Sequence, residues 1–343
     1  MSLSVKNKLI SIGETLNAYW GWARYGVFGK SIRLDVSTIC QLKCIDCSHG
    51  KNDIGILGIG YMEFEKFKDF VNRYPHFKHI EISNWGEIFL NPQLDAILRY
   101  AFQKKISLTA INGVNLNTAK NETLENLVKY RLREMTVSID GASNDTYKIY
   151  RCGGDFGTVI ENINRINYYK LKYHSEFPIL GWQFIVFPHN EHELALAREK
   201  ASALNMRFIP KLNWNEKAFP VKDLEFVRKE IKYASREERW QKTHRLYMPA
   251  CGLLWTSPQI NWDGKLLGCT ENKWCDFGNV FDLGLAKCMH NPRYLYMKKM
   301  LLALEKPEDD IPCLKCFKYK EVQLLSPRFR DLELRPTRSP WVI

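Results

Sequence analysis

The chain has 343 residues, of which 45% are apolar, and a formal net charge of +12 from 50 basic and 38 acidic residues. A chain of this size and composition can bury one large core and one smaller core, which excludes an intrinsically disordered protein. No stretch approaches the roughly 20 apolar residues of a membrane span, and the N-terminus lacks the apolar centre of a secretory signal. We therefore expect a cytoplasmic protein with no membrane span.

Short apolar runs with the composition of β-strands alternate with helical patterns in the first two thirds of the chain. The six predicted strands are 32–36, 79–83, 107–111, 135–139, 181–187 and 206–211. Between them, apolar residues recur at spacings of three and four, for example Phe64, Phe67 and Phe70. This alternation predicts an α/β fold with a parallel sheet, and six units form a partial (β/α)6 barrel. Functional residues are then expected at the carboxyl ends of the strands.

The pattern changes after residue 215, first to charged helical sequence and then to short elements rich in Gly, Trp and Cys. The charges are spread along helical segments such as 222–239, and this argues against a nucleic-acid partner. We expect an N-terminal helical extension at 1–30, the barrel at 31–215, a helical linker at 216–245, a small Cys-rich domain at 246–325 and a C-terminal tail at 326–343.

Three of the ten cysteines, Cys40, Cys44 and Cys47, directly follow the first predicted strand. In a reducing compartment, cysteines serve as metal ligands, functional thiols or small buried side chains more often than as disulfides. Spacings of four and three residues allow three thiolates to bind one face of an iron–sulfur cubane and to leave its fourth iron without a protein ligand. The alternative is a zinc site completed by His49, because zinc also binds thiolates and imidazoles.

This motif resembles the signature of the radical S-adenosylmethionine (SAM) superfamily, and residues after later strands extend the resemblance. Trp85, Gly86 and Glu87 are similar to the family's Gly-Gly-Glu motif, with Trp85 in place of the first glycine. The resemblance implies a [4Fe–4S] cluster whose open iron chelates SAM, and a motif whose carbonyl and carboxylate oxygens accept hydrogen bonds from the SAM ammonium group. It also implies SAM contacts from Asn112, Ser138, Asp140, Arg151 and Gln183.

A second group of cysteines lies in the C-terminal part and consists of Cys251, Cys269, Cys313 and Cys316. Four thiolates are the number needed to ligate a cubane completely. The Asp263-Gly264 turn between apolar residues predicts a β-hairpin in this segment. The arrangement is similar to the auxiliary-cluster domains called twitch and SPASM, with room for one auxiliary [4Fe–4S] cluster. A zinc ribbon is the alternative, and Cys275 can replace one of the four ligands.

The resemblance also implies the reaction. An electron from the first cluster cleaves SAM, and the resulting 5′-deoxyadenosyl radical abstracts a hydrogen atom from the substrate. A completely ligated auxiliary cluster can then accept a second electron, which gives oxidation, whereas a nearby thiol can return a hydrogen atom, which gives epimerisation. The candidate hydrogen donors are the remaining cysteines, Cys152, Cys275 and Cys288.

The single auxiliary cluster resembles the layout of 2-deoxy-scyllo-inosamine dehydrogenases, so we expect a small-molecule substrate such as a sugar or a cyclitol. A ribosomal-peptide maturase is an alternative, although the segment before the first strand is too short for the leader-binding module that such enzymes commonly carry. A non-catalytic iron–sulfur redox sensor is an alternative of another class. The net charge favours an acidic partner, and the resemblance implies an acidic electron donor such as flavodoxin or ferredoxin.

Overall fold

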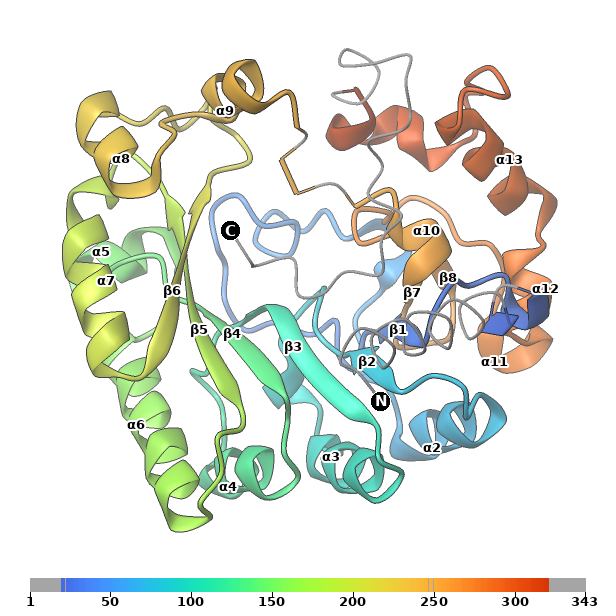
Figure 1. The fold of residues 1–343 in the computed structure, drawn as a ribbon, viewed down its shortest axis with the longest axis horizontal. Helices are drawn as coiled ribbons and strands as arrows, with labels where there is room; N and C mark the ends of the chain where they lie inside the picture. Colours follow the sequence, from blue (N-terminus) through green and yellow to red (C-terminus); the bar gives the residue numbers. More distant parts are fainter. Residues whose placement is uncertain (1–19, 22, 246, 249, 321–343) are drawn as a thin grey trace, which may run out of the picture. The chain divides into compact units, whose positions relative to one another are not determined.

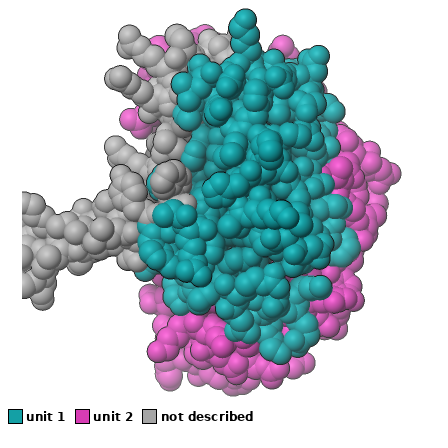
Figure 2. Space-filling view, turned by 90° about the vertical axis from the view of Figure 1, so that its right-hand side faces the viewer, with its two compact units in different colours: residues 1–35, 65–81, 248–343 teal, residues 36–64, 82–247 magenta. Residues whose placement is uncertain are grey.

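The computed structural model describes residues 20–21, 23–245, 247–248 and 250–320. The predicted C-terminal tail, most of the predicted N-terminal extension and the last residues of the predicted Cys-rich domain lie outside this part. The chain divides into two compact units, each assembled from segments that are distant in the sequence and each coloured separately in Figure 2. Unit 1 contains residues 1–35, 65–81 and 248–343, and unit 2 contains residues 36–64 and 82–247.

Unit 2 is built on four parallel strands that neighbour each other in the order of the chain. They are β3 (Ser107–Val114), β4 (Glu134–Ser138), β5 (Ile179–Val186) and β6 (Met206–Leu212). Nearly every residue of β5 is buried, which is typical of a strand inside a parallel sheet. The carboxyl ends of these strands lie at one edge, where Ser138 pairs with Gln183.

Helices cover the strands of unit 2, and α5, α6 and α7 lie along one side of β5 and β6 (Figure 1). The longest of them, α6, begins after Asp155, whose carboxylate accepts a hydrogen bond from the backbone N–H of Thr158. Its apolar residues Val159 and Ile163 are fully buried. The helical segments of this unit are η1 (Gly55–Leu57), η2 (Ile88–Leu90), α3 (Leu94–Gln103), α4 (Asn121–Lys129), α5 (Asn144–Tyr150), α6 (Phe156–Lys172), η3 (Glu191–Glu193), α7 (Leu194–Ala203), α8 (Leu224–Ile231) and α9 (Arg236–Thr243).

Unit 1 contains a smaller group of strands, in which parallel and antiparallel pairs are combined. They are β1 (Ser31–Leu34), β2 (His79–Glu81), β7 (Gln259–Ile260) and β8 (Leu266–Gly268). β1 pairs in parallel with both β2 and β7, and β7 pairs with β8 as an antiparallel hairpin. The predicted hairpin is therefore confirmed. The sequence did not reveal that it also continues the sheet beyond β1, with Arg33 aligned with Gln259.

The remaining helices of unit 1 are short. They are α2 (Phe64–Arg73), α10 (Leu253–Thr256), α11 (Val280–Leu283), α12 (Leu285–Met289), α13 (Pro292–Leu301) and η4 (Pro312–Lys315). All six strands predicted for the barrel are present, and their ends differ from the predicted ends by three residues or fewer. The predicted mixed α/β class with parallel strands is confirmed. None of the helices in the described part of the chain combines the length and the apolar composition needed to cross a bilayer.

Candidate functional site

The three cysteines of the first motif lie on one irregular loop of unit 2, which we call the Cys40–Cys47 loop. Backbone hydrogen bonds attach this loop to the chain around the end of α5. The N–H of Lys43 donates to the carbonyl of Cys152 at 2.9 Å, and the N–H of Ile45 donates to the carbonyl of Tyr150 at 3.4 Å. The loop is therefore positioned by main-chain contacts that do not depend on its own side chains.

An apolar shell surrounds the thiols of this loop. Cys44 packs in a buried cluster with Tyr150 and Phe187, and Cys40 and Cys47 lie partly buried against the same cluster. Burial raises the pKa of the Cys40 thiol to about 12 and also raises that of Cys44. Burial acts in the same direction on Cys47, but hydrogen bonds from the neighbouring His49 outweigh it and lower the pKa of that thiol.

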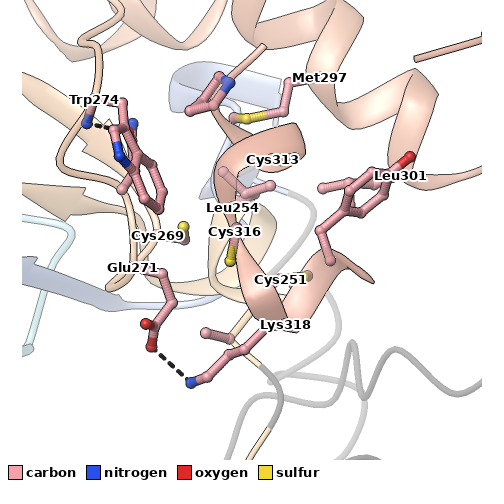
Figure 3. Close-up of a pocket in the computed structure, with 14 residues that line it drawn as sticks. Cys251, Leu254, Cys269, Glu271, Trp274, Met297, Leu301, Cys313, Cys316 and Lys318 are labelled. Carbon is pink, nitrogen blue, oxygen red and sulfur yellow. Dashed lines mark hydrogen bonds and ion pairs between the residues drawn. The ribbon is translucent and has the colours of Figure 1, made fainter. Parts of the chain in front are cut away.

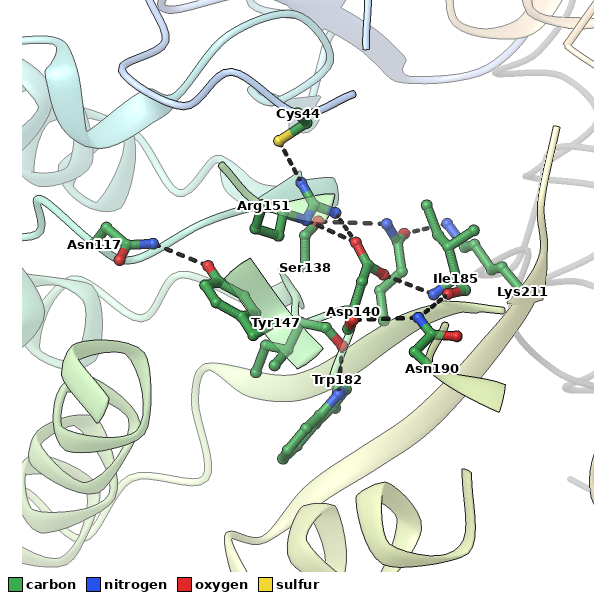
Figure 4. Close-up of polar contacts among 12 residues, drawn as sticks. Cys44, Asn117, Ser138, Asp140, Tyr147, Arg151, Trp182, Ile185, Asn190 and Lys211 are labelled. Carbon is green, nitrogen blue, oxygen red and sulfur yellow. Dashed lines mark hydrogen bonds and ion pairs between the residues drawn. The ribbon is translucent and has the colours of Figure 1, made fainter. Parts of the chain in front are cut away.

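Arg151 places a positive charge beside the loop (Figure 4). Its Nη1 lies 3.7 Å from Cys44 Sγ, and its Nε and Nη2 each lie 2.6 Å from Asp140 Oδ2. Asp140 is fully buried, and its second oxygen accepts the backbone N–H of Ile185 at 2.7 Å. Burial acts to lower the pKa of Arg151, but Asp140 raises it well above its ordinary value. Arg151 therefore remains a cation that faces a thiol, while Asp140 fixes its orientation.

Glu87 is a buried carboxylate whose oxygens both accept backbone hydrogen bonds. Oε2 accepts the N–H of Asn115 at 2.6 Å, and Oε1 accepts the N–H of Phe89 at 3.2 Å. Burial raises the pKa of Glu87 to about 7. Its own N–H donates to the carbonyl of Ile39 at 2.7 Å, immediately before the Cys40–Cys47 loop. The backbone N–H of Glu87 thus holds the start of the loop, while its carboxylate caps η2 and binds the backbone at Asn115.

Position 86 requires a glycine because the chain there lies directly against the backbone that leads into the same loop. Its φ is +74°, and a Cβ atom there would lie 2.6 Å from the backbone of Thr38. The neighbouring Trp85 ring lies 6.4 Å, centre to centre, from the ring of His49. His49 uses Nε2 in a 2.6 Å hydrogen bond with the carbonyl of Thr38. The His49 ring therefore lies between the Trp85 ring and the backbone that leads into the loop.

A row of polar side chains crosses the carboxyl ends of β4, β5 and β6 (Figure 4). Gln183 Nε2 donates to Ser138 Oγ at 3.3 Å, and Lys211 Nζ donates to Gln183 Oε1. Asn112, on β3, donates through Nδ2 to Asn84 Oδ1 at 2.8 Å. The structure therefore brings the predicted residues Ser138 and Gln183 together and adds Lys211, which is buried.

Three residues of this region were not found by the sequence analysis. Asn115 follows the true end of β3, which runs three residues beyond the predicted end. Lys211 is a charged residue at the carboxyl end of the predicted strand 206–211, and this position could have identified it as a site residue. Asn190 is fully buried and donates to the carbonyls of Ile185 and Asp140 at 2.9 and 3.2 Å. Its contact with Asp140 could not be predicted from the sequence, because the two residues are 50 positions apart.

The cysteines of the second motif line one pocket in unit 1, which we call the four-thiol pocket (Figure 3). They come from three segments: one before α10, one after β8, and η4 with the residue that follows it. These cysteines are Cys251, Cys269, Cys313 and Cys316. Burial raises the pKa of all four thiols, to about 12 for Cys251, and neighbouring thiols add to the effect on Cys251, Cys269 and Cys313. Four thiols that line one pocket with an apolar wall are a donor set suited to a metal cluster.

The other three cysteines differ from each other, and all ten cysteines are free thiols. Cys152 is partly exposed, and its thiol donates to the carbonyl of Ile149 at 3.5 Å. Cys275 is absent from the lining of the four-thiol pocket. Cys288 is buried within α12, where a Cβ added at Gly278 would lie 3.1 Å from its Sγ. Cys288 is therefore a packing residue of unit 1.

Comparisons with known proteins bear on the second site and on the fold. The SPASM family model, described as an iron–sulfur cluster-binding domain, matches residues 251–317, which contain the whole second motif. No protein with a curated description matches the chain in sequence. SuiB of Streptococcus suis bound to S-adenosylmethionine is similar in structure over 92% of this chain and 77% of SuiB, with 14% identity and a TM-score of 0.60.

Two further solved structures add to this comparison. SuiB bound to the precursor peptide SuiA matches over 88% of this chain and 73% of SuiB, with 12% identity and a TM-score of 0.58. BtrN in complex with AdoMet and 2-DOIA matches over 79% of this chain and 86% of BtrN, with 13% identity and a TM-score of 0.45, which is too low to support an inference. Similarity to SuiB at this level of identity establishes a shared fold. The chain therefore has the fold of SuiB, and its residues 251–317 match the SPASM iron–sulfur cluster-binding domain.

Proposed function

We propose that this protein is a radical SAM enzyme that reductively cleaves SAM and removes a hydrogen atom from a sugar-like or cyclitol-like small molecule, which it then oxidises. Epimerisation is the competing outcome. The observation that carries the proposal is the difference between the two thiol sites. One loop offers three thiols beside a cation, and a separate pocket offers four thiols, of which Cys313 and Cys316 are buried. A cubane with three thiolate ligands retains an open iron, whereas one with four is closed.

Iron–sulfur clusters and zinc ions require different arrangements of their thiol ligands. The ligands of a cubane bind different iron atoms and are therefore farther apart than ligands that share one ion. Among the residues that the structure describes, no three His, Cys, Asp or Glu side chains are close enough to hold a single metal ion. The match of residues 251–317 to an iron–sulfur cluster-binding domain supports a cubane over a zinc ribbon in the four-thiol pocket.

When bound, the first cluster and SAM supply the electron transfer and the radical chemistry. The chain's own residues supply binding and orientation. Arg151, held by Asp140, offers a fixed cation for the SAM carboxylate, and Ser138 and Gln183 offer hydrogen bonds at the same edge of the sheet. The backbone of Trp85 and Gly86 remains the proposed partner of the SAM ammonium group. The apolar residues around Cys44 exclude water from the reacting groups.

The surroundings of the three cysteines outside the two motifs, Cys152, Cys275 and Cys288, favour oxidation over epimerisation. An epimerase needs a thiol that delivers hydrogen to the substrate. Cys288 is enclosed in the core of unit 1 and cannot reach a substrate. Cys275 and Cys152 are partly exposed and remain candidates, and the Cys152 thiol already donates to a backbone carbonyl. The four-thiol pocket, by contrast, fits an acceptor of the second electron.

The test uses protein that is reconstituted anaerobically with iron and sulfide. We expect about eight irons per chain, as two cubanes of four, and formation of 5′-deoxyadenosine from SAM after reduction with dithionite. Deuterium-labelled sugars and cyclitols then identify the substrate by transfer of deuterium to 5′-deoxyadenosine. Protein with eight irons that forms no 5′-deoxyadenosine would contradict the proposal and favour a redox sensor.

A peptide substrate is the second candidate, and the similarity to SuiB bound to a precursor peptide favours it. A small molecule and a peptide are separated by the same deuterium experiment, carried out with labelled peptides. The net charge of +12 supports an acidic electron donor such as flavodoxin or ferredoxin. Ten free thiols support a reducing compartment such as the cytoplasm.

A further inference from the structure

An ion pair lies at the four-thiol pocket, although neither of its members belongs to the cysteine motif. Lys318 Nζ lies 2.6 Å from Glu271 Oε1, and both side chains line the pocket (Figure 3). The Lys318 side chain is only 9% exposed, and that of Glu271 is 25% exposed. An ion pair this far removed from water interacts more strongly than one on the open surface.

The positions of the two residues connect them to the ligands. Glu271 stands two residues after Cys269, and Lys318 stands two residues after Cys316. Lys318 Nζ also donates to the carbonyl of Met248 at 3.2 Å, three residues before Cys251. One ammonium group therefore touches all three segments that bring cysteines to the pocket.

The rest of the pocket wall is mainly apolar. Besides the thiols and this pair, the lining includes Leu254, Trp274, Met297, Leu301 and Pro312. A fixed charge acts over a longer distance in such surroundings than in water. A cubane with four thiolates carries negative charge, which increases when it accepts an electron. A nearby ammonium group stabilises the reduced form, and a nearby carboxylate destabilises it.

We propose that the Glu271–Lys318 pair sets the reduction potential of the auxiliary cluster, with Lys318 raising the potential and Glu271 limiting the rise. This inference rests on the proposed function, because it requires a cluster in the four-thiol pocket. The reduction potential matters for the electron that leaves the substrate radical during oxidation. The substrate radical loses one electron to the oxidised auxiliary cluster and one proton to solvent, so that the substrate is oxidised and the cluster is reduced by one electron. A higher potential makes this transfer more favourable.

The experiment uses the full-length chain with Cys40, Cys44 and Cys47 changed to Ala, so that the auxiliary cluster is the only one titrated. Lys318→Met removes the cation, and Glu271→Gln removes the anion at nearly constant volume. The midpoint potential is measured by titration monitored by electron paramagnetic resonance. We expect a more negative potential for Lys318→Met and a more positive potential for Glu271→Gln. Lys318→Arg and Glu271→Asp keep the charges and serve as matched controls with potentials close to that of the parent.

The sign of the shifts separates electrostatic tuning from a purely structural role. If the pair only holds the three segments together, both charge-removing variants lose iron to a similar extent or shift in the same direction, and that result would overturn the inference. Four irons with unchanged potentials in both variants would also overturn it, while leaving the proposed function intact. A parent protein that binds zinc instead of iron in the four-thiol pocket would overturn the inference together with the assignment of the auxiliary cluster.

Discussion

The two thiol sites of this chain are assembled in opposite ways. The Cys40–Cys47 loop carries its three thiols within eight consecutive residues, and the fold holds the loop from outside through Arg151 and Glu87. The four-thiol pocket collects its thiols from three segments spread over residues 251–316, and the fold itself creates the site. A contiguous site keeps its ligand spacing whenever the loop is anchored. A dispersed site exists only when unit 1 is folded.

This difference agrees with the proposed division of roles. An open iron must be reached by SAM, and a loop at the carboxyl ends of the strands offers that access. A closed cluster that only exchanges electrons needs protection from solvent, which a pocket between short helices provides. Four changes, from the largest expected effect to the smallest, test the comparison.

The largest effect is expected from the cysteines themselves. Cys40→Ala, Cys44→Ala or Cys47→Ala should each abolish formation of 5′-deoxyadenosine, because each removes a ligand of the cluster that cleaves SAM. Cys313→Ala should retain measurable 5′-deoxyadenosine but lose the oxidised product, because it acts on the acceptor of the second electron. Both products are measured by liquid chromatography with mass detection. Full SAM cleavage in all three loop variants would refute the radical SAM assignment.

The next effect concerns the anchor of Arg151. Asp140→Asn leaves a buried guanidinium without its charge partner, and removal of one member of a buried pair costs about 3–5 kcal/mol of unfolding free energy. Urea unfolding measures the change. The control is Glu161→Gln, which breaks the exposed Glu161–Arg165 pair on α6 and should cost less than about 1 kcal/mol. Equal effects of the two variants would mean that Arg151 does not depend on Asp140.

A pH-dependent effect is expected from Glu87. Its pKa in the folded protein is about 7, above the ordinary value of 4.5, so the folded state holds this proton more tightly than the unfolded state. Stability is therefore lost as the pH rises from about 5 through 7, by up to about 3 kcal/mol. Glu87→Gln cannot ionise and should lack this loss. The unfolding free energies of both proteins at pH 5 and pH 8 give the comparison, and parallel changes would show that Glu87 does not titrate in this range.

The sequence predicted the cysteine ligands of both sites but not the side-chain contacts around them. The strands and the Cys40–Cys47 loop could be predicted because apolar periodicity and ligand spacing are local properties. The hydrogen bonds of Glu87 could not be predicted, because Asn115 follows a β3 that continues past the irregular residues around Gly113. The Glu271–Lys318 ion pair could not be predicted either. Charged residues near cysteines are common, and only the fold brings these two within 2.6 Å of each other.

The smallest effect is expected from Cys152, and it decides between oxidation and epimerisation. The Cys152 carbonyl, not its thiol, accepts the hydrogen bond from Lys43, so Cys152→Ala should keep the Cys40–Cys47 loop in place. The stability change should stay within about 0.5 kcal/mol because the side chain is partly exposed. The buried Cys288→Ala is the comparison and should cost more. With the substrate found by deuterium transfer, both variants should form 5′-deoxyadenosine and oxidised product as the unmodified protein does. Loss of an inverted product in Cys152→Ala alone, with 5′-deoxyadenosine retained, would show that this thiol donates hydrogen and that the enzyme is an epimerase.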